Sequence, residues 1–514
     1  MTGVTFESRP MTGPAPLRPG AEPMPRDRLR GWLVTITLTA LAAVTRFVGL
    51  GSPTDGRTPV FDEKYYSAQA WEILNNGMGI EDNPGFPLVA HPPVGKLLMT
   101  VGELLFGWSP WGWRFSAAVC GTLLVLLVIR IVRRLTRSTL VGAIAGILLI
   151  ADGVSMVSSR IGMLDIFLAL LVTAAFGCLI VDRDEVRERF APVLAEGRIS
   201  LSPYGPRLGV RWWRFGAGVL LGLACGTKWS GGYFMLCFLV LCLGFDYAAR
   251  RANRVERPLL GTLVRDAGPA LFALVAIPLA VYLFSYAGWF ASETGVNRYA
   301  VGVTVGRDGY FAFVPDALRS LWYNSAWVLN FHVNLTNSSG QHHNWESKPW
   351  TWPMGLRPML YYLYTGPEPG AGCGAPQCVS ALMLLGTPAI WWLAFPALGW
   401  AGWRSIAHRD WRYAAVLTGY CAGWLPWFIE LDRQMYFFYA TAMAPFLVML
   451  IALPLGEILG RATDSSERRG TGRLVVCLYL GLVVANFIWI HPILTATPIT
   501  PSRWQQELWL PSWR

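Results

Sequence analysis

Apolar stretches of about 20 residues recur along the chain and are separated by short polar links. A helix of about 20 apolar residues crosses a hydrocarbon core about 30 Å thick, so each stretch is a candidate membrane span. The pattern predicts an all-α polytopic membrane protein with about eleven transmembrane helices. The expected spans are residues 31–50, 113–132, 138–157, 163–181, 211–227, 231–247, 267–287, 384–403, 412–429, 435–457 and 472–491.

Two polar links, residues 51–112 and 288–383, are far longer than a turn. Any function outside the membrane must be built from these links and the adjoining span ends. The expected organisation is a disordered cytoplasmic head (1–30), a transmembrane module with spans 1–7 and the first link (31–287), a large outer loop (288–383), a C-terminal module with spans 8–11 (384–491) and an outer tail (492–514).

The first link, 51–112, shows the helical period twice. Asp62 suits an N-cap, and Asn75-Asn76-Gly77 suits the end of a helix of about thirteen residues. HPPVGKLLMTVGELLFG (91–107) predicts a second helix, because prolines suit a first turn and apolar residues follow at helical spacing. Both are too short to span a bilayer, so we expect two helices resting at the membrane interface.

Composition and charge support a membrane protein. Hydrophobic residues make up 53% of the 514 residues and charged ones 15%, against roughly 25% charged residues in soluble domains. The net charge of +11 does not indicate nucleic-acid binding, because the arginines are spread over short links. With a cytoplasmic N-terminus, most of the 43 Lys and Arg residues lie inside, as the positive-inside rule requires. Both long links are then outside, after an uncleaved first helix.

Two of the nine cysteines, Cys373 and Cys378 in AGCGAPQC, lie in the second long link. Disulfides persist outside the membrane, so a disulfide that closes this loop is favoured over two free thiols. A zinc site would need further ligands, and none has suitable spacing.

Ionisable side chains at the outer ends of spans are costly, and each requires a reason. The candidates are Asp62, Glu63, His91, Arg114, Arg160, Asp165, Lys228 and Arg433. Structural explanations stay open for several of them. Helix capping would explain one carboxylate of the Asp62–Glu63 pair. An interhelical ion pair would explain Arg160 and Asp165, and snorkelling would explain Lys228.

A catalytic explanation is also open. A carboxylate can take a proton from a hydroxyl nucleophile, and cations can hold a phosphate and stabilise it as it leaves. The phosphate of a membrane lipid lies at this depth, which favours group transfer from a lipid-linked phosphate. A transporter could use the same charges, but it would place them near span centres and show inverted repeats, and the two halves of the chain lack visible symmetry.

The motifs around these charges resemble, in order and spacing, those of the protein O-mannosyltransferases, GT-C-type glycosyltransferases that use polyprenyl- or dolichyl-phosphate mannose. They are FDEKYY, HPPVGKLL, WRFSAA, SSRIGMLDIF, GTKWSGG, HHNWESKPWTWP (342–353) and FFYATAMAPF (437–446). The resemblance implies a GT-C fold and inverting transfer of mannose from a β-linked lipid phosphate to Ser or Thr hydroxyls of proteins being translocated.

The resemblance also implies roles for individual residues. The acidic pair is the family's catalytic motif, so Asp62 and Glu63 inherit that role. Asp62 is favoured as the base and Glu63 as a positioning group, but which of them removes the proton stays open. The expected phosphate ligands are Lys228, Arg160 and Arg114, in falling order. Further donor or acceptor contacts are expected from His91, Lys96, Asp165, His343, Glu346, Ser347, Lys348 and Arg433.

Eukaryotic members carry a β-trefoil (MIR) domain between the seventh and eighth spans, and the loop 288–383 is too short for one, so the chain resembles the bacterial form. We expect no cofactor, since the leaving group is a monophosphate, although paired carboxylates often hold a divalent metal. The implied partners are polyprenyl-phosphate mannose, Ser/Thr-containing secreted proteins, the translocation machinery and membrane lipids, with no nucleic acid. The implied location is the plasma membrane, with an extracytoplasmic active site. The nearest rival is a GT-C enzyme that glycosylates a lipid or polysaccharide.

Overall fold

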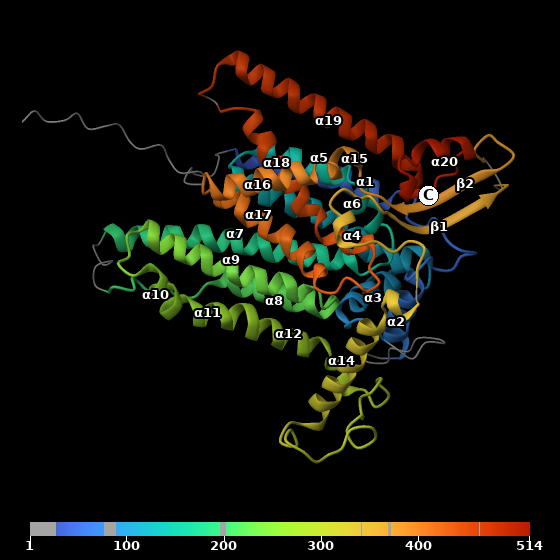
Figure 1. Ribbon diagram of the computed structural model, residues 1–514, viewed down its shortest axis with the longest axis horizontal. Helices are drawn as coiled ribbons and strands as arrows, with labels where there is room; N and C mark the ends of the chain where they lie inside the picture. Colours follow the sequence, from blue (N-terminus) through green and yellow to red (C-terminus); the bar gives the residue numbers. More distant parts are fainter. Residues whose placement is uncertain (1–26, 77–88, 196–201, 341, 368–371, 462) are drawn as a thin grey trace, which may run out of the picture.

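The structure is a computed structural model that describes residues 27–76, 89–195, 202–340, 342–367, 372–461 and 463–514. The predicted disordered head lies outside the described residues up to position 26. Long helices run side by side along the longest axis (Figure 1). Short helices and a β-hairpin gather at one end of this bundle, which we call the loop end, and the opposite end is called the far end.

Helices occupy the predicted apolar stretches. The first module contains α1 (Arg28–Phe47), α4 (Pro110–Thr136), α5 (Thr139–Ile150), α6 (Gly153–Ser158), α7 (Asp165–Ala195), α8 (Trp212–Thr227), α9 (Gly231–Ala252), and α10 (Pro258–Thr262), α11 (Gly268–Leu271) and α12 (Ile277–Ser285), joined by the π-helical segments η2 (Leu263–Ala267) and η3 (Phe272–Ala276). The second contains α15 (Pro388–Trp391), α16 (Ala394–Ile406), α17 (Trp411–Trp424), η6 (Leu425–Phe428), η7 (Phe437–Ala442), α18 (Ala444–Ile458) and α19 (Ser466–Thr495).

Five helical segments among the described residues are long and apolar enough to cross a membrane. They are Pro110–Thr136, Asp165–Val193, Gly231–Ala252, Pro258–Ser285 and Ser466–Thr495. They account for five of the eleven predicted spans, and the full number of crossings stays a prediction.

The predicted third span, 138–157, is not one continuous helix. The chain leaves the helical path between α5 and α6, where the buried carboxylate of Asp152 accepts a hydrogen bond from the Ser155 N–H (2.9 Å) and so caps α6. Its other oxygen accepts from the indole Nε1 of Trp391 (2.6 Å). A carboxylate within the run caps α6 and is held by a donor from another module, and together they divide an apolar run that is continuous in the sequence.

The long links fold at the loop end. In the first link, α2 (Glu63–Asn76) and α3 (Val94–Phe106) occupy the segments with helical period, and their place at a membrane interface stays a prediction. The second link contains α13 (Ala287–Ala291), α14 (Asp316–Asn334), the short helices η4 (Asn337–Ser339) and η5 (Pro349–Thr351), and an antiparallel hairpin of β1 (Met359–Gly366) and β2 (Cys378–Leu384). The sequence analysis did not predict this hairpin.

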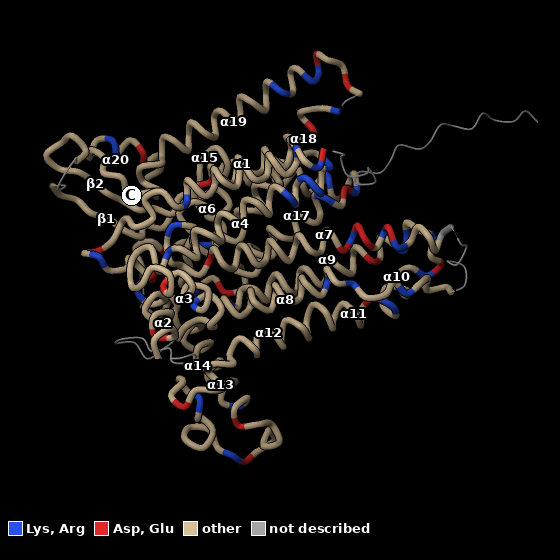
Figure 2. Tube along the Cα trace, turned by 180° about the vertical axis from the view of Figure 1, so that it is seen from behind, with Lys and Arg blue, Asp and Glu red and all other residues tan. Residues whose placement is uncertain are grey.

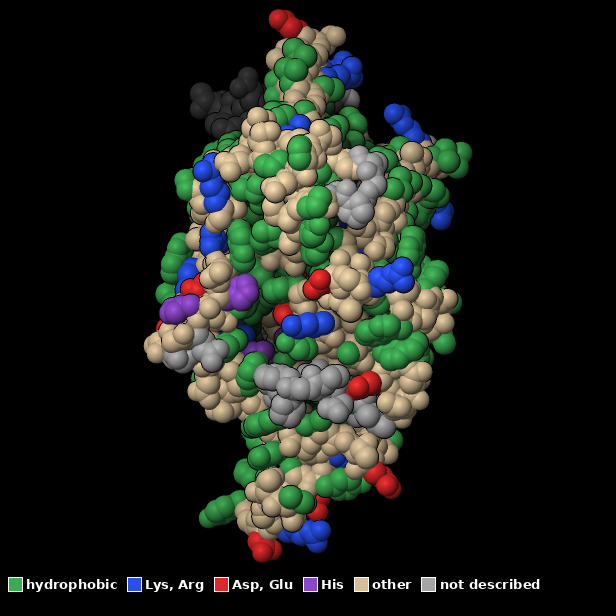
Figure 3. Space-filling view, turned by 90° about the vertical axis from the view of Figure 1, so that its right-hand side faces the viewer, with side chains coloured by type: hydrophobic (Ala, Val, Ile, Leu, Met, Phe, Trp, Pro, Cys, Tyr) green, Lys and Arg blue, Asp and Glu red, His purple; other side chains and the backbone are tan. Residues whose placement is uncertain are grey.

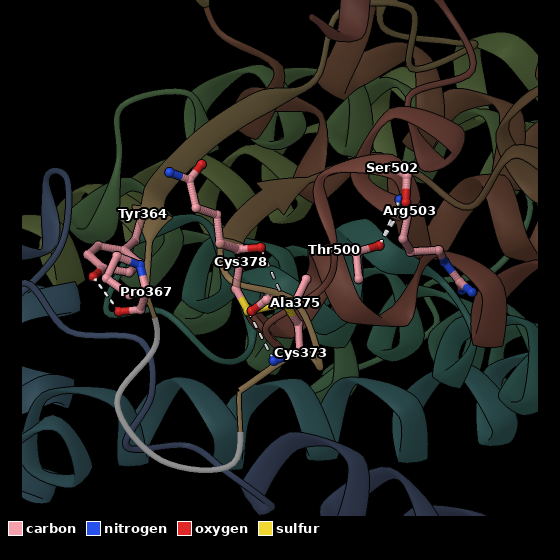
Figure 4. The surroundings of a disulfide bond; sticks show 9 residues. Tyr364, Pro367, Cys373, Ala375, Cys378, Thr500, Ser502 and Arg503 are labelled. Atoms are coloured by element: carbon pink, nitrogen blue, oxygen red, sulfur yellow. Dashed lines mark hydrogen bonds between the residues drawn. A yellow bond between two sulfur atoms is a disulfide. The ribbon is translucent and has the colours of Figure 1, made fainter.

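Cys373 and Cys378 form a disulfide with an S–S distance of 2.03 Å beside the start of β2 (Figure 4). The C-terminal tail packs against the same region. Ile499 exchanges two backbone hydrogen bonds with Val379 of β2 (2.8 and 3.0 Å), and the short helices α20 (Pro501–Glu507) and η8 (Pro511–Trp513) follow.

The last residues of the tail contact the segment that precedes β1. The hydroxyl of Ser512 donates to the Leu356 carbonyl, and the guanidinium of Arg357 donates to the Ser512 carbonyl (both 2.5 Å). Arg357 also donates to the Asn344 carbonyl. The tail therefore holds the second link in place.

A buried ionic network joins three helices toward the far end, where many of the charged residues gather (Figure 2). Arg211, just before α8, donates to Asp182 of α7 (2.6 and 2.5 Å) and to Asp246 of α9 (3.1 Å). Arg214 of α8 donates to Asp246 (2.7 Å) and lies 3.4 Å from Asp182. All four side chains are buried, so every charge is balanced inside the network.

We expect Asp246→Ala to lower the free energy of unfolding by about 3–5 kcal/mol, because it leaves buried positive charge without its partner. The measurement is a reversible SDS titration in mixed micelles. Glu256→Gln is the matched control, since Glu256 is exposed and its pairing with Arg257 (4.0 Å) is worth at most about 1 kcal/mol. Equal losses from both variants would contradict this account of the network.

Candidate active site

Glu63, the first residue of α2, is completely buried and fully bonded. Arg114 of α4 approaches its carboxylate with two donors, Nε to Oε1 (2.6 Å) and Nη2 to Oε2 (2.8 Å). The backbone N–H groups of Gly162 (2.7 Å) and Val60 (3.1 Å) donate to the same two oxygens. With four donors on one buried carboxylate, Glu63 is a structural anion rather than a free base.

Arg114 extends this junction to the end of the first span. Its remaining donors reach the carbonyls of Leu50 (3.1 Å) and Pro53 (2.8 Å). Gly162 is required on the opposite side, because a Cβ at this position would lie 2.9 Å from Cγ of Glu63. Glu63 and Arg114 therefore fix the start of α2 relative to α4 and to the link between α6 and α7.

Asp62 is next to Glu63 in sequence but has different surroundings. Its backbone carbonyl accepts from the N–H groups of Tyr65 and Tyr66 at the start of α2. Its carboxylate is partly exposed and makes no hydrogen bond or ion pair with any described residue. The capping explanation for this side chain therefore has no support. Burial raises the pKa of Asp62 to about 6, and the positive charge of Lys228 offsets part of the rise. The group is thus a base poised near neutral pH.

The residue before Asp62 is held by aromatic packing. Phe61 adopts a left-handed backbone conformation (φ 52°), which residues other than glycine rarely adopt. Its ring packs against Tyr361 of β1 (5.1 Å between centroids), Phe438 of η7 (6.3 Å) and His343 of the second link (6.3 Å). The second long link and η7 thus position Phe61, the residue that precedes Asp62.

Lys228 lies directly after α8 and pairs with Asp165, the first residue of α7. Its Nζ donates to both carboxylate oxygens, at 2.8 and 2.9 Å, and both side chains are buried. The ammonium also lies over the rings of Phe438 (5.3 Å) and Tyr439 (5.5 Å). Asp165 therefore pairs with Lys228, and the alternative pairing with Arg160 is wrong.

A cavity of about 230 Å³ opens beside this pair. Its polar lining includes His91, Asp165, Lys228, His332, Arg433 and Tyr439. A second, mostly apolar cavity of about 430 Å³ shares His91 and Trp229 with it and extends between α3, α8, α12 and α14. Figure 3 looks onto the loop end, where histidine, acidic and basic side chains surround a hollow. A charged chamber thus continues into an apolar one.

Two histidines line the charged chamber, and one of them, His91, also lines the apolar chamber. The rings of His91 and His332 stack with centroids 5.7 Å apart. Burial and the nearby cations lower the pKa of both, that of His332 to about 4, so both are neutral at pH 7. Nε2 of His332 lies 3.2 Å from the Ala90 carbonyl and donates to it, which leaves Nδ1 to face Nη2 of Arg433 (3.5 Å). Nε of Arg433 is buried and has no acceptor among the described residues.

Three side chains that were predicted to contact the donor or the acceptor bind other groups of the protein instead. Arg160 donates to carbonyls at the end of α1, including those of Val48 (2.6 Å) and Gly49 (3.0 Å). Arg114 is bound to Glu63, and Lys96 is completely buried, with its Nζ 2.9 Å from the His91 carbonyl. None of the three lines the polar cavity, so the structure gives no support to a phosphate contact from Arg160 or Arg114.

The segment HHNWESKPWTWP acts mainly by holding other groups. Nζ of Lys348 donates to the carbonyls of Leu431 (2.9 Å) and Arg433 (3.0 Å), which fixes the backbone of Arg433. Oγ of Ser347 accepts from Nε1 of Trp352 (2.8 Å). Glu346 accepts from Asn337 (3.1 Å), and His343 packs on Phe61 as described.

The sequence analysis did not select Trp229, His332 and Tyr439. Trp229 and Tyr439 stand inside the motifs GTKWSGG and FFYATAMAPF, so those motifs were the available signal. No sequence motif pointed to His332, which is a lone histidine on α14. Its partner His91 is 241 residues away, as their numbers show. In the described part of the chain, no group of three or more His, Cys, Asp or Glu side chains is arranged to hold a metal ion.

Comparisons with known proteins show similarity over almost the whole chain. The family model described as dolichyl-phosphate-mannose-protein mannosyltransferase matches residues 36–291, and the model of the C-terminal four-span region of protein-O-mannosyltransferase matches residues 318–513. The chain is 61% identical to a polyprenol-phosphate-mannose–protein mannosyltransferase of Mycobacterium tuberculosis over 98% of this chain and 96% of that protein. The protein of the same description from Corynebacterium glutamicum is 43% identical over 93% and 92%.

Solved structures show a similar fold. A chain of the S. cerevisiae protein O-mannosyltransferase Pmt1-Pmt2 complex, bound to the sugar donor, matches with a TM-score of 0.69 at 15% identity, over 94% of this chain and 93% of that one. ArnT from Cupriavidus metallidurans matches with a TM-score of 0.51 at 16% identity, over 91% and 77%. The fold is therefore that of the GT-C glycosyltransferases.

Substitutions of the two adjacent carboxylates, Glu63 and Asp62, are expected to have different effects on stability. Glu63→Gln leaves Arg114 buried without its counter-charge, so the free energy of unfolding falls by about 3–5 kcal/mol. Asp62 has a folded-state pKa above its usual 3.8, so its ionised form opposes folding at pH 7. Asp62→Asn is therefore expected to be as stable as the parent protein or more stable. Thermal midpoints at pH 7 in one detergent test this, and a loss with Asp62→Asn as large as with Glu63→Gln would contradict it.

Proposed function

Because the chain belongs to the dolichyl-phosphate-mannose–protein mannosyltransferase family, we propose that it transfers mannose from a polyprenyl-phosphate carrier to Ser or Thr hydroxyls of proteins. The observation that carries this proposal is the carboxylate of Asp62, which has no hydrogen bond or ion pair with a described residue and lies within electrostatic reach of the buried Lys228–Asp165 pair. That pair lines the charged chamber, which adjoins the apolar one. A sugar phosphate on an isoprenoid tail has the same division into a charged and an apolar part.

In this scheme Asp62 is the general base. The acceptor hydroxyl oxygen bonds to C1 of mannose while the bond from C1 to the phosphate oxygen breaks, and the hydroxyl proton passes to Asp62. The electrons of the broken bond remain on the phosphate, which leaves with its polyprenyl chain. Attack from the face opposite the phosphate inverts the anomeric centre. Glu63 does not exchange the proton, because its four donors hold it as an anion.

The phosphate is stabilised by Lys228 and Arg433. The ammonium group of Lys228 lines the charged chamber. Arg433 lines it too, and its Nε has no acceptor among the described residues. Charge-assisted hydrogen bonds from such donors strengthen as the phosphate gains charge. A phosphate is a good leaving group once its charge is balanced, so this scheme does not require a metal. Neutral His91 donates to the sugar or the phosphate from the boundary between the chambers.

The apolar chamber takes the first isoprene units of the donor. Leu97, Leu223, Val281 and Phe284 line it, and each is an aliphatic or aromatic surface that suits a hydrocarbon chain. The module 31–287 supplies the base and most of this chamber, and the outer loop 288–383 covers the acceptor side with His343, Glu346 and Ser347. We place the site on the extracytoplasmic side of the plasma membrane, with the N-terminus in the cytoplasm, where secreted proteins arrive from the translocation machinery.

A membrane assay with labelled polyprenyl-phosphate mannose and a Ser/Thr-rich peptide tests the function. Asp62→Asn is expected to reduce transfer at least about 10²-fold, as loss of a general base does, and to retain donor binding. Asp55→Asn, an exposed acid in the same link, is the matched control and retains transfer. Transfer by the parent protein to a glycolipid but to no peptide would favour the rival acceptor class. Transfer near the parental rate with Asp62→Asn would remove Asp62 as the base.

The pKa of Asp62 also predicts the pH dependence. The base must be ionised, so kcat/KM is expected to rise with pH through about 6 and to fall about tenfold per unit below it. His91 and His332 are already neutral in this range, so their titration does not change the rate. Initial rates between pH 5 and 8 measure the pH dependence of kcat/KM. The control Asp55→Asn is expected to show the same rise with pH as the parent protein. A flat profile from pH 5 to 7 would contradict the assignment.

A further inference from the structure

A separate polar cavity of about 690 Å³ lies at the far end of the bundle. It is formed where α4 and α18 end, where α5 and α19 begin, and beside α16 and α17. Its lining contains six arginines but two acids, Glu457 and Asp464. The arginines are Arg137, Arg404, Arg412, Arg461, Arg469 and Arg473, and we call this the far-end arginine cavity. Figure 2 shows basic residues gathered around the ends of these helices.

Carboxylates balance only part of this charge. Asp410 pairs with Arg412 (2.7 Å) and lies 3.4 Å from Arg404, which also donates to Glu457 (2.9 Å). Arg137 pairs with Asp184 (2.9 Å). Even when these two acids behind the lining are counted, the six arginines exceed the four carboxylates by at least two, because Asp184 also pairs with Arg134 and Arg183. The cavity therefore has a surplus of positive charge.

The surplus is located on the side formed by α19. The side chains of Arg461 and Arg473 have no hydrogen bond or ion pair with any described residue. Nε of Arg469 and Nε of Arg404 are buried without an acceptor in the described part of the chain. Leaving a buried donor of a charged group unsatisfied is costly, so these N–H groups indicate an anionic ligand with several oxygens.

Apolar surface continues directly from this charged wall. Leu140, Val141, Leu453 and Leu459 line the same cavity. From there α19 exposes a row of leucines one turn apart, Leu474 (60% exposed), Leu478 (65%) and Leu482 (60%). At this end α19 stands apart from the other helices (Figure 1). A headgroup in the cavity would thus have room for its acyl chains along α19, which a soluble anion does not need.

We propose that the far-end arginine cavity binds the phosphate headgroup of an anionic membrane lipid. Arginine forks match phosphate oxygens with paired hydrogen bonds, and basic pockets between transmembrane helices are suited to anionic headgroups. A headgroup with two phosphates, as in cardiolipin, would balance two of these surplus charges. The bound lipid joins the turn between α4 and α5 to α18 and α19. This site is distinct from the donor chamber, which lies at the loop end.

Native mass spectrometry of the purified full chain with added cardiolipin, phosphatidylglycerol or phosphatidylcholine tests the proposal. We expect the parent protein to bind cardiolipin at least about tenfold more tightly than phosphatidylcholine, with phosphatidylglycerol between them. The variant with Arg461→Gln, Arg469→Gln and Arg473→Gln is expected to lose this preference. The corresponding triple Lys variant, which keeps the charge, is expected to recover most of it.

The matched control is the variant with Arg251→Gln, Arg254→Gln and Arg257→Gln, which removes three exposed charges at the same end outside the cavity and keeps the preference. Thermal midpoints show whether each variant is folded. Equal binding of anionic and zwitterionic lipid by the parent protein would overturn the proposal. So would equal binding by the Gln variant and the control, or displacement of cardiolipin by millimolar inorganic phosphate, which would make the ligand a soluble anion.

Discussion

The completely buried ion pair of Glu63 and Arg114 is the constraint on which the loop end depends. Burial of two charges is favourable only when further hydrogen bonds satisfy the remaining donors and acceptors. Here the carboxylate has four donors, and the guanidinium also reaches two carbonyls that follow the first span. The pair therefore places the start of α2, and with it Asp62, at one position relative to α4 and α7. Of two carboxylates adjacent in sequence, one forms the framework, and the other has no hydrogen bond or ion pair with a described residue.

Local pattern predicted much of this arrangement. Apolar stretches located the bundle helices, and helical period located α2 and α3, because both depend on neighbours within one turn. Pattern failed where a distant partner decides the structure. Asp152 divides an apolar run because Trp391, from the second module, donates to it. Arg160 was predicted to bind a phosphate because a charge at the end of a span is costly without a partner. In the structure, the carbonyls at the end of α1 accept its hydrogen bonds. The sequence indicates which charges need a partner, and the fold determines which partner they have.

This distinction separates the cations of the bundle into two kinds. Those whose donors end on carboxylates or carbonyls, such as Arg160 and Arg211, hold helices together. Arg433 at one end and Arg469 at the other keep a buried N–H without an acceptor among the described residues. An unsatisfied buried donor of a charged group is costly, so each is a position where a ligand could complete the hydrogen bonding. Both places lie next to apolar surface, which suits ligands that are themselves part of the bilayer.

The contacts of the C-terminal tail determine when the site is completed during synthesis. Ser512 bonds to Leu356 and Arg357, and Arg357 bonds to Asn344. The neighbouring His343 packs on Phe61, the residue before the proposed base. Residues separated by about 450 positions thus share one short chain of contacts. A ribosome adds roughly 5–20 residues per second, so this interval lasts on the order of half a minute or more. Throughout it, the nascent protein lacks the tail contacts that hold the second link near Phe61.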